Sequence, residues 1–540
     1  MSLPNILDYS KLKPQGIEAS QKLTRFYPTT NLPNTDIVRF LINSNGFWDP
    51  MSSYLQIKVR PKATSATPFP ADGSDGVYAS QLDNSAASFI HTFQVMCNGV
   101  EIERVDYYEI LASMLNDVFY SKEQRKQHSH EGFGHGDDYN LSYDYVTPIC
   151  SLKVDPENEI SLNDNDPLVN PAHLNFKSDG GTGEPVLRAS TYSNHNSTAY
   201  KELTFCIPVL SSLWGILIPP EEIKYIPMFL FPNLEFNFRL NPYAMFNLSL
   251  LGGYAVRNFE IFEMELYANI IYFDSSVNDA VLDLANSGKL FFHSNSFYYG
   301  PMFNIIANGS LTASYQINMS FKSLKALFWC FIPNNYRSNT YSRQINRKAL
   351  SVTSAQVRLG SELYPNFPII GNSAYTSTNA PFLINLYKAL GRLHDTANDS
   401  LINQNTFICG NTMTEEEKIG ITENYNKLME WKNGYVPGQV TFPFLAGTTF
   451  NGSANVFAFS RNNRLTNSLV GRAVYGIDLD TITSDESVIS GLNSMKNKPF
   501  ELILEGTNPI NNNMEMHIFL YYDYVIDIKG VGMFDILGRN

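Results

Sequence analysis

The segment HSHEGFGHGDD, which begins at His128, holds the densest group of potential metal ligands in the sequence. Imidazole nitrogens and carboxylate oxygens bind zinc and related divalent ions in proteins. The glycines between these side chains favour a mobile surface loop instead, so we expect neither a bound metal nor any other cofactor. The side chains that could serve as ligands are His128, His130, His135, Asp137 and Asp138.

Basic side chains gather in the segment YRSNTYSRQINRK, and no acidic residue lies between Phe331 and Gly360. Arginines interleaved with tyrosines suit contacts with phosphates and stacked bases, which makes this segment a candidate contact patch. A solvated loop without a partner is the alternative. Because the whole chain is acidic, with a net charge of −13, we expect no sequence-specific binding to nucleic acid. The patch residues are Arg337, Arg343, Arg347 and Lys348.

The motifs of the common enzyme classes are absent. The sequence contains no GxxxxGK[ST], HExxH, GxSxG or GxGxxG, which would indicate phosphate, metalloprotease, hydrolase or dinucleotide chemistry. Its five cysteines form no CxxC pair, so neither a zinc knuckle nor a disulfide framework is indicated. We therefore expect a protein that is not an enzyme and has no catalytic residues.

Two groups of apolar and aromatic side chains are typical of protein interfaces, where tyrosine and phenylalanine are enriched. One group lies near the N-terminus and the other near the start of the second half of the chain. Both could also fill a hydrophobic core. The candidate interface residues are Leu23, Phe26, Tyr27, Phe297, Tyr298 and Tyr299.

Composition and residue pattern predict an all-β protein. The 540 residues include 36 Phe and 31 Tyr, with 33 Gly and 28 Pro to form turns. Alternating apolar residues predict strands, for example at 53–59, and Asn98-Gly99 between two apolar runs predicts a hairpin with a type I′ turn. Short helices are expected after Asp106, with Asp106 as N-cap and Glu109 completing a capping box, and over 381–394.

The strand pattern occurs twice, and each half ends in a long apolar strand, at 259–274 and at 514–528. Prolines and the lack of a clear period indicate an extended arm before the first half. A short segment with few strand formers indicates a linker between the halves. The expected organisation is an arm over 1–35, a β-half over 36–274 with long loops at 120–200, a linker over 275–288, and a β-half over 289–540 with an insertion at 360–440.

The order of motifs resembles that of the double jelly-roll major capsid proteins of polinton-like viruses and virophages. The resemblance starts with NSNGFWDPMSSYLQIKV and FIHTFQVMCNGVEIERVDYYEILASMLND, and continues at FEMELYANIIYFD. In the second half it covers INMSFKSLKALFWCFIP, QVRLGSELYPNFPI and FLINLYKALGRLHD. It implies two tandem eight-stranded antiparallel jelly rolls with short helices and long loop insertions.

The same resemblance implies a function. The chain would be the major capsid protein of an icosahedral double-stranded DNA virus, made in the host cytoplasm or nucleus and located in the virion. Its partners would be two further copies in a trimeric pseudo-hexagonal capsomer, neighbouring capsomers, and penton and minor or cement proteins. An internal membrane is a further partner that the resemblance neither requires nor excludes. In this reading the arm, including Leu23, Phe26 and Tyr27, lies beneath the capsomer and contacts a neighbour or an underlying cement or membrane layer.

Two other functions remain open at this point. A minor capsid protein of the vertex or spike would share the jelly-roll architecture but assemble with different symmetry. A carbohydrate-binding β-sandwich would use tryptophans on its surface as platforms for sugars. The tryptophans that test this second alternative are Trp48, Trp214, Trp329 and Trp431.

Overall fold

The computed structural model describes both halves of the chain and omits mainly the long insertions. The described residues are 19–33, 35–61, 78–82, 85–121, 124, 127–133, 192–193, 203–214, 225–249, 255–256, 259–311, 314–334, 347–371, 379–393, 400, 402, 407, 472–480, 490–494, 499–509 and 513–538. No helix within these ranges is long and apolar enough to cross a membrane.

The first half is a jelly roll. One sheet has the order β1-β13-β3-β8 and the other the order β2-β10-β5-β6. If the eight strands are lettered B to I along the chain, these orders are B-I-D-G and C-H-E-F, the arrangement that defines a jelly roll. The strands are β1 (Ala19–Phe26), β2 (Ile37–Ile42), β3 (Phe47–Pro61), β5 (Ile90–Cys97), β6 (Val100–Asp106), β8 (Leu203–Ile207), β10 (Leu234–Leu240) and β13 (Phe259–Phe273).

The second half repeats this arrangement. Its sheets have the orders β14-β22-β17-β20 and β16-β21-β18-β19, which are again B-I-D-G and C-H-E-F. The all-β double jelly roll expected from the sequence is therefore confirmed. The strands are β14 (Leu290–Tyr299), β16 (Tyr315–Gln316), β17 (Leu324–Pro333), β18 (Ser351–Leu359), β19 (Glu362–Ile370), β20 (Tyr475–Asp478), β21 (Phe500–Thr507) and β22 (Met514–Gly530).

Smaller elements extend both rolls. A further four-stranded sheet has the order β12-β11-β4-β7, and short strands add to β3 and β22. The additional strands are β4 (Tyr78–Leu82), β7 (Tyr192–Ser193), β9 (Ile226–Pro227), β11 (Met245–Ser249), β12 (Ala255–Val256), β15 (Phe303–Ile305) and β23 (Met533–Leu537). The helices are η3 (Ala86–Phe89), α1 (Tyr108–Phe119), η4 (Ser129–Glu131), η6 (Met228–Leu230), α7 (Ser275–Asn286) and α8 (Ala380–Ala389).

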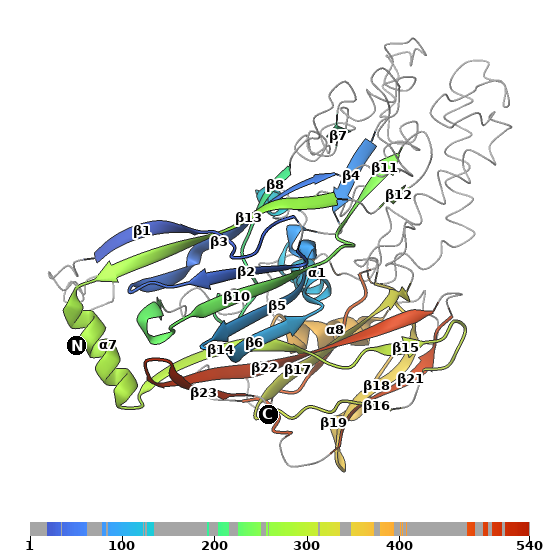
Figure 1. Cartoon of the computed structure of the whole chain (residues 1–540). Coiled ribbons are helices and arrows are strands. Elements are labelled where there is room, and N and C mark those ends of the chain that lie inside the picture. The colour runs from blue at the N-terminus through green and yellow to red at the C-terminus, as the bar shows by residue number, and fades with distance from the viewer. Residues whose placement is uncertain are drawn as a thin grey trace, which may run out of the picture.

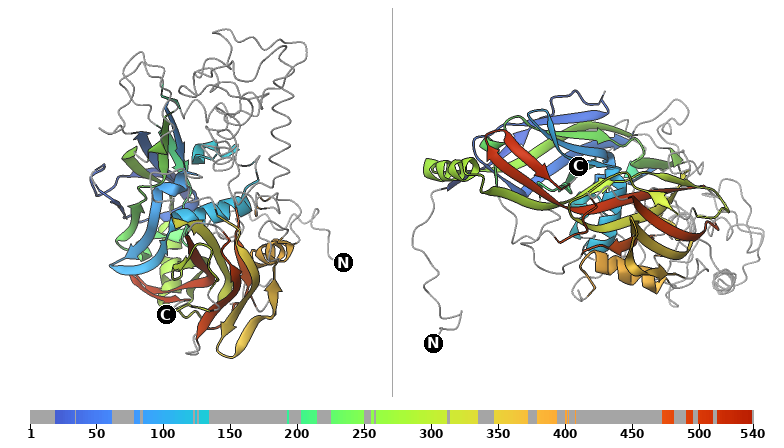
Figure 2. Two further views of the ribbon diagram at one scale, coloured as in Figure 1. Left: turned by 90° about the vertical axis from the view of Figure 1, so that its right-hand side faces the viewer. Right: turned by 90° about the horizontal axis from the view of Figure 1, so that it is seen from below.

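The two rolls stand side by side, with α1 between them and α7 crossing from one to the other at one end (Figure 1). The views in Figure 2 show the same arrangement, with α8 on the outer side of the second roll. Apolar side chains from the facing sheets fill each roll, and Phe40, Phe93 and Leu327 are among those fully buried.

Local sequence explains several of these elements. Asn98 and Gly99 have φ values of 49° and 78°, as a type I′ turn requires, and they connect β5 to β6 as predicted. The capping box predicted for α1 is wrong, because Asp106 is the last residue of β6 and Tyr107 occupies the N-cap position without a side-chain hydrogen bond. Glu109 instead accepts a hydrogen bond at Oε1 from His91 Nδ1 at 3.0 Å.

The segments expected as an arm and a linker both contain regular structure. Within the expected arm, β1 pairs antiparallel with β13 along its whole length and occupies position B of the first roll. The roll therefore begins at least as early as residue 19, before the boundary expected at 36. The expected linker is mostly α7, whose N-cap Asp274 accepts a hydrogen bond from Ser275 N at 2.7 Å. Much of the loop range 120–200 lies outside the described residues.

Candidate functional site between the two rolls

Helix α1 forms the centre of the contact between the rolls. Its residues from Tyr108 to Val118 are all buried, including polar ones. A helix on a protein surface buries only one stripe, so burial on all sides means that α1 is enclosed by both rolls. The predicted apolar stripe is thus only part of the buried surface.

A buried ionic cluster joins α1 to the second roll. Asp117 is fully buried, and its carboxylate accepts hydrogen bonds from Arg347 Nη2 and Arg472 Nη1. Arg347 Nη1 also donates to Ser113 Oγ, one turn earlier in the helix. A charged group in the protein interior is tolerated when it is paired and hydrogen-bonded. The carboxylate belongs to one roll and the guanidinium groups belong to the other, so these buried charges are paired only while the rolls are in contact.

The end of α1 is also held by the second half of the chain. Arg392 Nη1 donates to the Val118 carbonyl at 3.2 Å, and Ser400 Oγ donates to the Asp117 carbonyl at 3.1 Å. The Arg392 guanidinium lies 4.2 Å from the centre of the Phe119 ring. The last carbonyls of a helix have no hydrogen-bond donor within the helix, so Arg392 and Ser400 supply the donors that the helix itself lacks.

A second buried carboxylate, Glu103 in β6, collects donors from both rolls. It accepts hydrogen bonds from Ser211 Oγ at 2.6 Å, Ser212 N at 2.9 Å and Ser296 Oγ at 2.5 Å. Ser296 belongs to β14 of the second roll. Three donors on one carboxylate offset the cost of removing it from water.

Neutral hydrogen bonds and aromatic contacts complete this junction. Tyr524 OH donates to the Ile102 carbonyl at 2.5 Å. The Tyr107 ring lies 4.4 Å from the Tyr299 ring and 5.2 Å from the His517 ring, centre to centre. At the far end of the rolls, Gly532 N donates to the Leu230 carbonyl at 2.9 Å. The two rolls are thus fixed to each other along their length by polar and aromatic contacts.

The second group of predicted interface residues lies within the second roll and at the junction between the rolls. Phe297 is buried, with its ring 4.8 Å from that of Tyr521 in the second roll. Tyr299 lies in the junction described above, and Tyr298 is half-buried with its ring 6.0 Å from the Phe321 ring. Phe297 was a candidate interface residue, and the structure corrects this prediction. Its side chain lies on the inner face of β14 and belongs to the core.

The first group lies at the surface. Leu23 is 53% exposed and Tyr27 is 61% exposed, while Phe26 is partly buried against the core. The Arg25 guanidinium lies 4.7 Å from the centre of the Tyr27 ring. Leu23 and Tyr27 therefore remain available to a partner, and their role as interface residues stays a prediction.

The predicted basic patch needs a correction at Arg347. This side chain is fully buried in the ionic cluster with Asp117, because the chain after residue 346 enters the junction between the rolls. It is therefore not part of an accessible patch. Lys348 is partly buried, and Arg337 and Arg343 lie outside the described residues.

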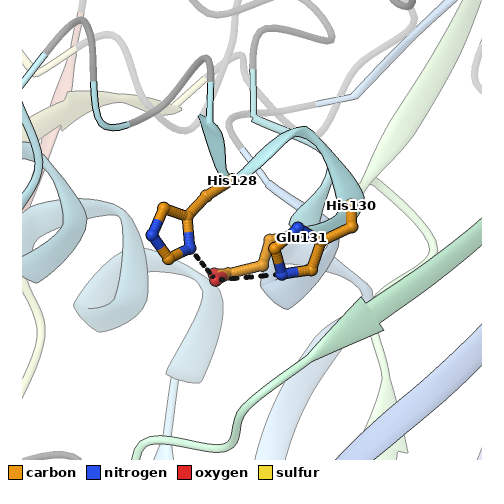
Figure 3. A group of neighbouring side chains, drawn as sticks. All are labelled: His128, His130 and Glu131. Atoms are coloured by element: carbon orange, nitrogen blue, oxygen red, sulfur yellow. Dashed lines mark hydrogen bonds and ion pairs between the residues drawn. The ribbon is translucent and has the colours of Figure 1, made fainter.

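The candidate metal ligands lie together only in part. Figure 3 shows that the His128 and His130 rings both face Glu131. His128 Nδ1 is 2.7 Å from Glu131 Oε1, and His130 Nε2 is 3.8 Å from the same oxygen. Glu131 was not among the predicted ligands, although its spacing of three residues from His128 suits a shared site. His135, Asp137 and Asp138 lie outside the described residues.

Burial affects the titration of this group. It raises the pKa of Glu131 above its ordinary value, against the opposing effect of the hydrogen bond with His128. Burial also lowers the pKa of His130, and the charge of His128 acts in the same direction. The shift at His130 favours the neutral imidazole, which is the form that binds metal ions, whereas the shift at Glu131 disfavours the carboxylate that a metal ligand requires.

The tryptophans do not form sugar platforms in the described part of the chain. Trp48, Trp214 and Trp329 have exposed fractions of 0%, 1% and 0%, and the Trp48 and Trp214 rings pack edge to face at 5.1 Å. Trp431 lies outside the described residues. Buried indoles stabilise the cores of the rolls and cannot stack on a ligand.

No protein-family model matches the sequence, and no curated protein matches it. Three solved structures are similar over nearly the whole chain. The PBCV-1 protein VP54, fitted into a reconstruction of the virophage Sputnik, has a TM-score of 0.48 and 9% identity, with 98% of each chain covered. The Faustovirus major capsid protein has a TM-score of 0.45 and 11% identity, covering 97% of this chain and 92% of its own. The mavirus major capsid protein has a TM-score of 0.44 and 9% identity, covering 99% and 95%.

Proposed function

We propose that this chain is the major capsid protein of an icosahedral double-stranded DNA virus and that three copies form a pseudo-hexagonal capsomer. The observation that carries the proposal is the repetition of one jelly roll, with sheet orders B-I-D-G and C-H-E-F, in two halves that stand side by side. Three copies of a two-roll chain supply six similar units around a three-fold axis, and repeated interfaces with closed symmetry build such assemblies economically.

The junction between the rolls supports a role in a lattice. A subunit that tiles a shell must present its outer contacts at fixed positions. Asp117 and Glu103, each bonded across the junction, hold the two rolls at one relative position. Breaking a buried, paired carboxylate is costly, so the rolls resist sliding past each other.

Leu23 and Tyr27 are the candidates for contact with a neighbour. Leu23 lies on β1, which is an edge strand of its sheet, and Tyr27 follows directly after β1. Both side chains are more than half exposed. Exposed apolar side chains beside an open sheet edge favour association with another chain. We expect Leu23→Ser with Tyr27→Ser to leave the fold intact and to impair assembly of capsomers into shells.

Purified recombinant protein tests the proposal by light scattering and by electron microscopy with class averaging. We expect a particle of three times the 60.9 kDa chain mass with a hexagonal outline and three-fold symmetry. Five-fold particles would favour the minor vertex protein instead. Monomers at all concentrations would contradict both, and the absence of enzymatic activity stays a separate prediction.

A further inference from the structure

We propose that His128, His130 and Glu131 bind a divalent transition-metal ion, with Zn²⁺ as the ion that fits best. One nitrogen from each histidine and a carboxylate oxygen lie within 4.8 Å of one another. The two rings come from either side toward one carboxylate (Figure 3). This inference is independent of the proposed capsid function.

The spacing of the three donor atoms suits a tetrahedral ion. Zinc binds imidazole nitrogen and carboxylate oxygen at about 2.0–2.2 Å, which places two ligand atoms of a tetrahedron about 3.3 Å apart. The two distances to Glu131 Oε1, 2.7 Å from His128 and 3.8 Å from His130, lie on either side of this value. The two nitrogens lie within 4.8 Å of each other, so the histidine side chains must approach each other by up to about 1.5 Å to bring all three donors to the ion.

The chemical nature of the donors selects the class of metal. Two imidazoles and one carboxylate suit zinc and its transition-metal neighbours, whereas Mg²⁺ and Ca²⁺ prefer oxygen ligands alone. The His128 and His130 side chains are 38% and 60% exposed, so the ion can enter from solvent and water can complete the tetrahedron. Three protein ligands and one open position are a common arrangement for zinc.

The backbone around the donors is held in place before any ion binds. Glu131 N donates to the His128 carbonyl at 3.0 Å within the turn that contains η4. Gly132 follows with a φ of +83°, and a Cβ atom there would lie 2.8 Å from the Leu82 side chain and 3.1 Å from Ala86 N. The turn is therefore packed closely against the first roll. The ion would connect the solvent-facing His130 to the buried Glu131.

A Co²⁺ titration of the metal-free full-length protein tests this site, because tetrahedral Co²⁺ gives strong visible absorption bands that octahedral Co²⁺ lacks. We expect one such site per chain, displaced by Zn²⁺, and an upward shift of the thermal unfolding midpoint with Zn²⁺. His128→Ala, His130→Ala and Glu131→Gln should each weaken binding more than the roughly 10–100-fold that loss of an outer-shell contact causes.

The chain offers a matched control. His91 Nδ1 lies 3.0 Å from Glu109 Oε1, which is a similar histidine–glutamate pair but outside the three-residue cluster. His91→Ala should leave Co²⁺ affinity and spectrum unchanged. Absence of the tetrahedral bands in the wild-type protein would overturn the proposal. Equal affinity in the wild type and in His130→Ala, whose exposed side chain makes misfolding an inadequate explanation, would overturn it as well.

Discussion

Arg347 Nη2 donates a hydrogen bond to Asp117 Oδ2 across the junction between the two rolls, although 230 residues separate them in the chain. Neither side chain is exposed to solvent. Because Arg472 Nη1 donates to the same carboxylate, undocking would separate Asp117 from both of its cationic partners, and this cluster makes the docking of the rolls a condition for the stability of both.

Replacing Asp117 with alanine should destabilise the chain strongly. The substitution leaves the Arg347 and Arg472 guanidinium groups buried without their shared carboxylate. Removing one partner from a buried ion pair typically costs about 3–5 kcal/mol. Urea unfolding followed by tryptophan fluorescence measures the loss.

Two further variants test the cause of that loss. Asp535→Asn removes an ion pair with Lys529 whose side chains are 58% and 50% exposed, and it should change stability little. Asp117→Leu combined with Arg347→Met and Arg472→Met replaces all three charges and should recover much of the stability. A triple variant as unstable as Asp117→Ala would contradict the ionic explanation.

Ser296→Ala should loosen the contact between the rolls without disrupting either one. The substitution removes the donor that the second roll contributes to Glu103, while Ser211 and Ser212 remain. A hydrogen bond to a charged group contributes about 1.5–3 kcal/mol. Hydrogen exchange should show faster exchange at β6 and β14 than in Ser314→Ala, in which the exposed Ser314 loses its hydrogen bond to the partly buried Glu501. Equal exchange in both variants would refute this prediction.

Acid should destabilise the second roll through Asp523. Burial alone would raise the pKa of this carboxyl, but His293, Ser323 and Lys325 together lower it below its ordinary value of 3.8. A carboxyl whose pKa is lower in the folded state stabilises the fold above its unfolded pKa, and this contribution is lost as the pH falls through the folded pKa.

The measurement is the unfolding free energy as a function of pH for Asp523→Asn and the wild-type protein. The variant should be less stable at neutral pH and should lose less stability between about pH 5 and pH 2. Asp527→Asn, on the same strand, is the comparison with a carboxyl in another environment. An acid slope unchanged by Asp523→Asn would contradict the assignment.

Cys330 should resist alkylation in the native protein. It is fully buried, and burial raises the pKa of its thiol to about 12 against the opposing charge of Arg347. The thiolate is the reactive form, and at pH 8 about one molecule in ten thousand would carry it. Iodoacetamide labelling with peptide mass spectrometry should find Cys206, which is only partly buried, modified before Cys330. Early labelling of Cys330 in folded protein would contradict the packing described.

Local patterns predicted the elements whose signals lie within a few residues. Asn98-Gly99 identified its hairpin because the positive φ values of the turn depend on those two residues alone. The long strand β13 was readable because Met264, Leu266, Ala268 and Ile270 alternate toward the core. By contrast, β1 escaped prediction because it is an edge strand with mostly exposed residues, so no alternation marks it.

The junction could not be predicted from local patterns. Arg347 sits among other basic residues in the sequence, which indicated a solvated patch, and its partner Asp117 belongs to the other half of the chain. Only the packing of two folded rolls brings them together. Glu131 was not predicted for a different reason. Three histidines and two aspartates lie near it in the sequence, and the sequence alone does not select which of these potential ligands come together.

The position of β22 also bears on how this chain is made. It lies between β14 and β17 in the sheet, yet it is the last of these three strands in the chain. Until the ribosome has made β22, β14 lacks the strand with which it pairs, and the second roll cannot close. The first roll receives its own last strand, β13, by residue 273, but Asp117 within it must wait for Arg347 and Arg472. A chain that stops before β22 would therefore have one nearly finished roll, an Asp117 carboxylate without its guanidinium partners in place and an open sheet, which cellular proteases can recognise.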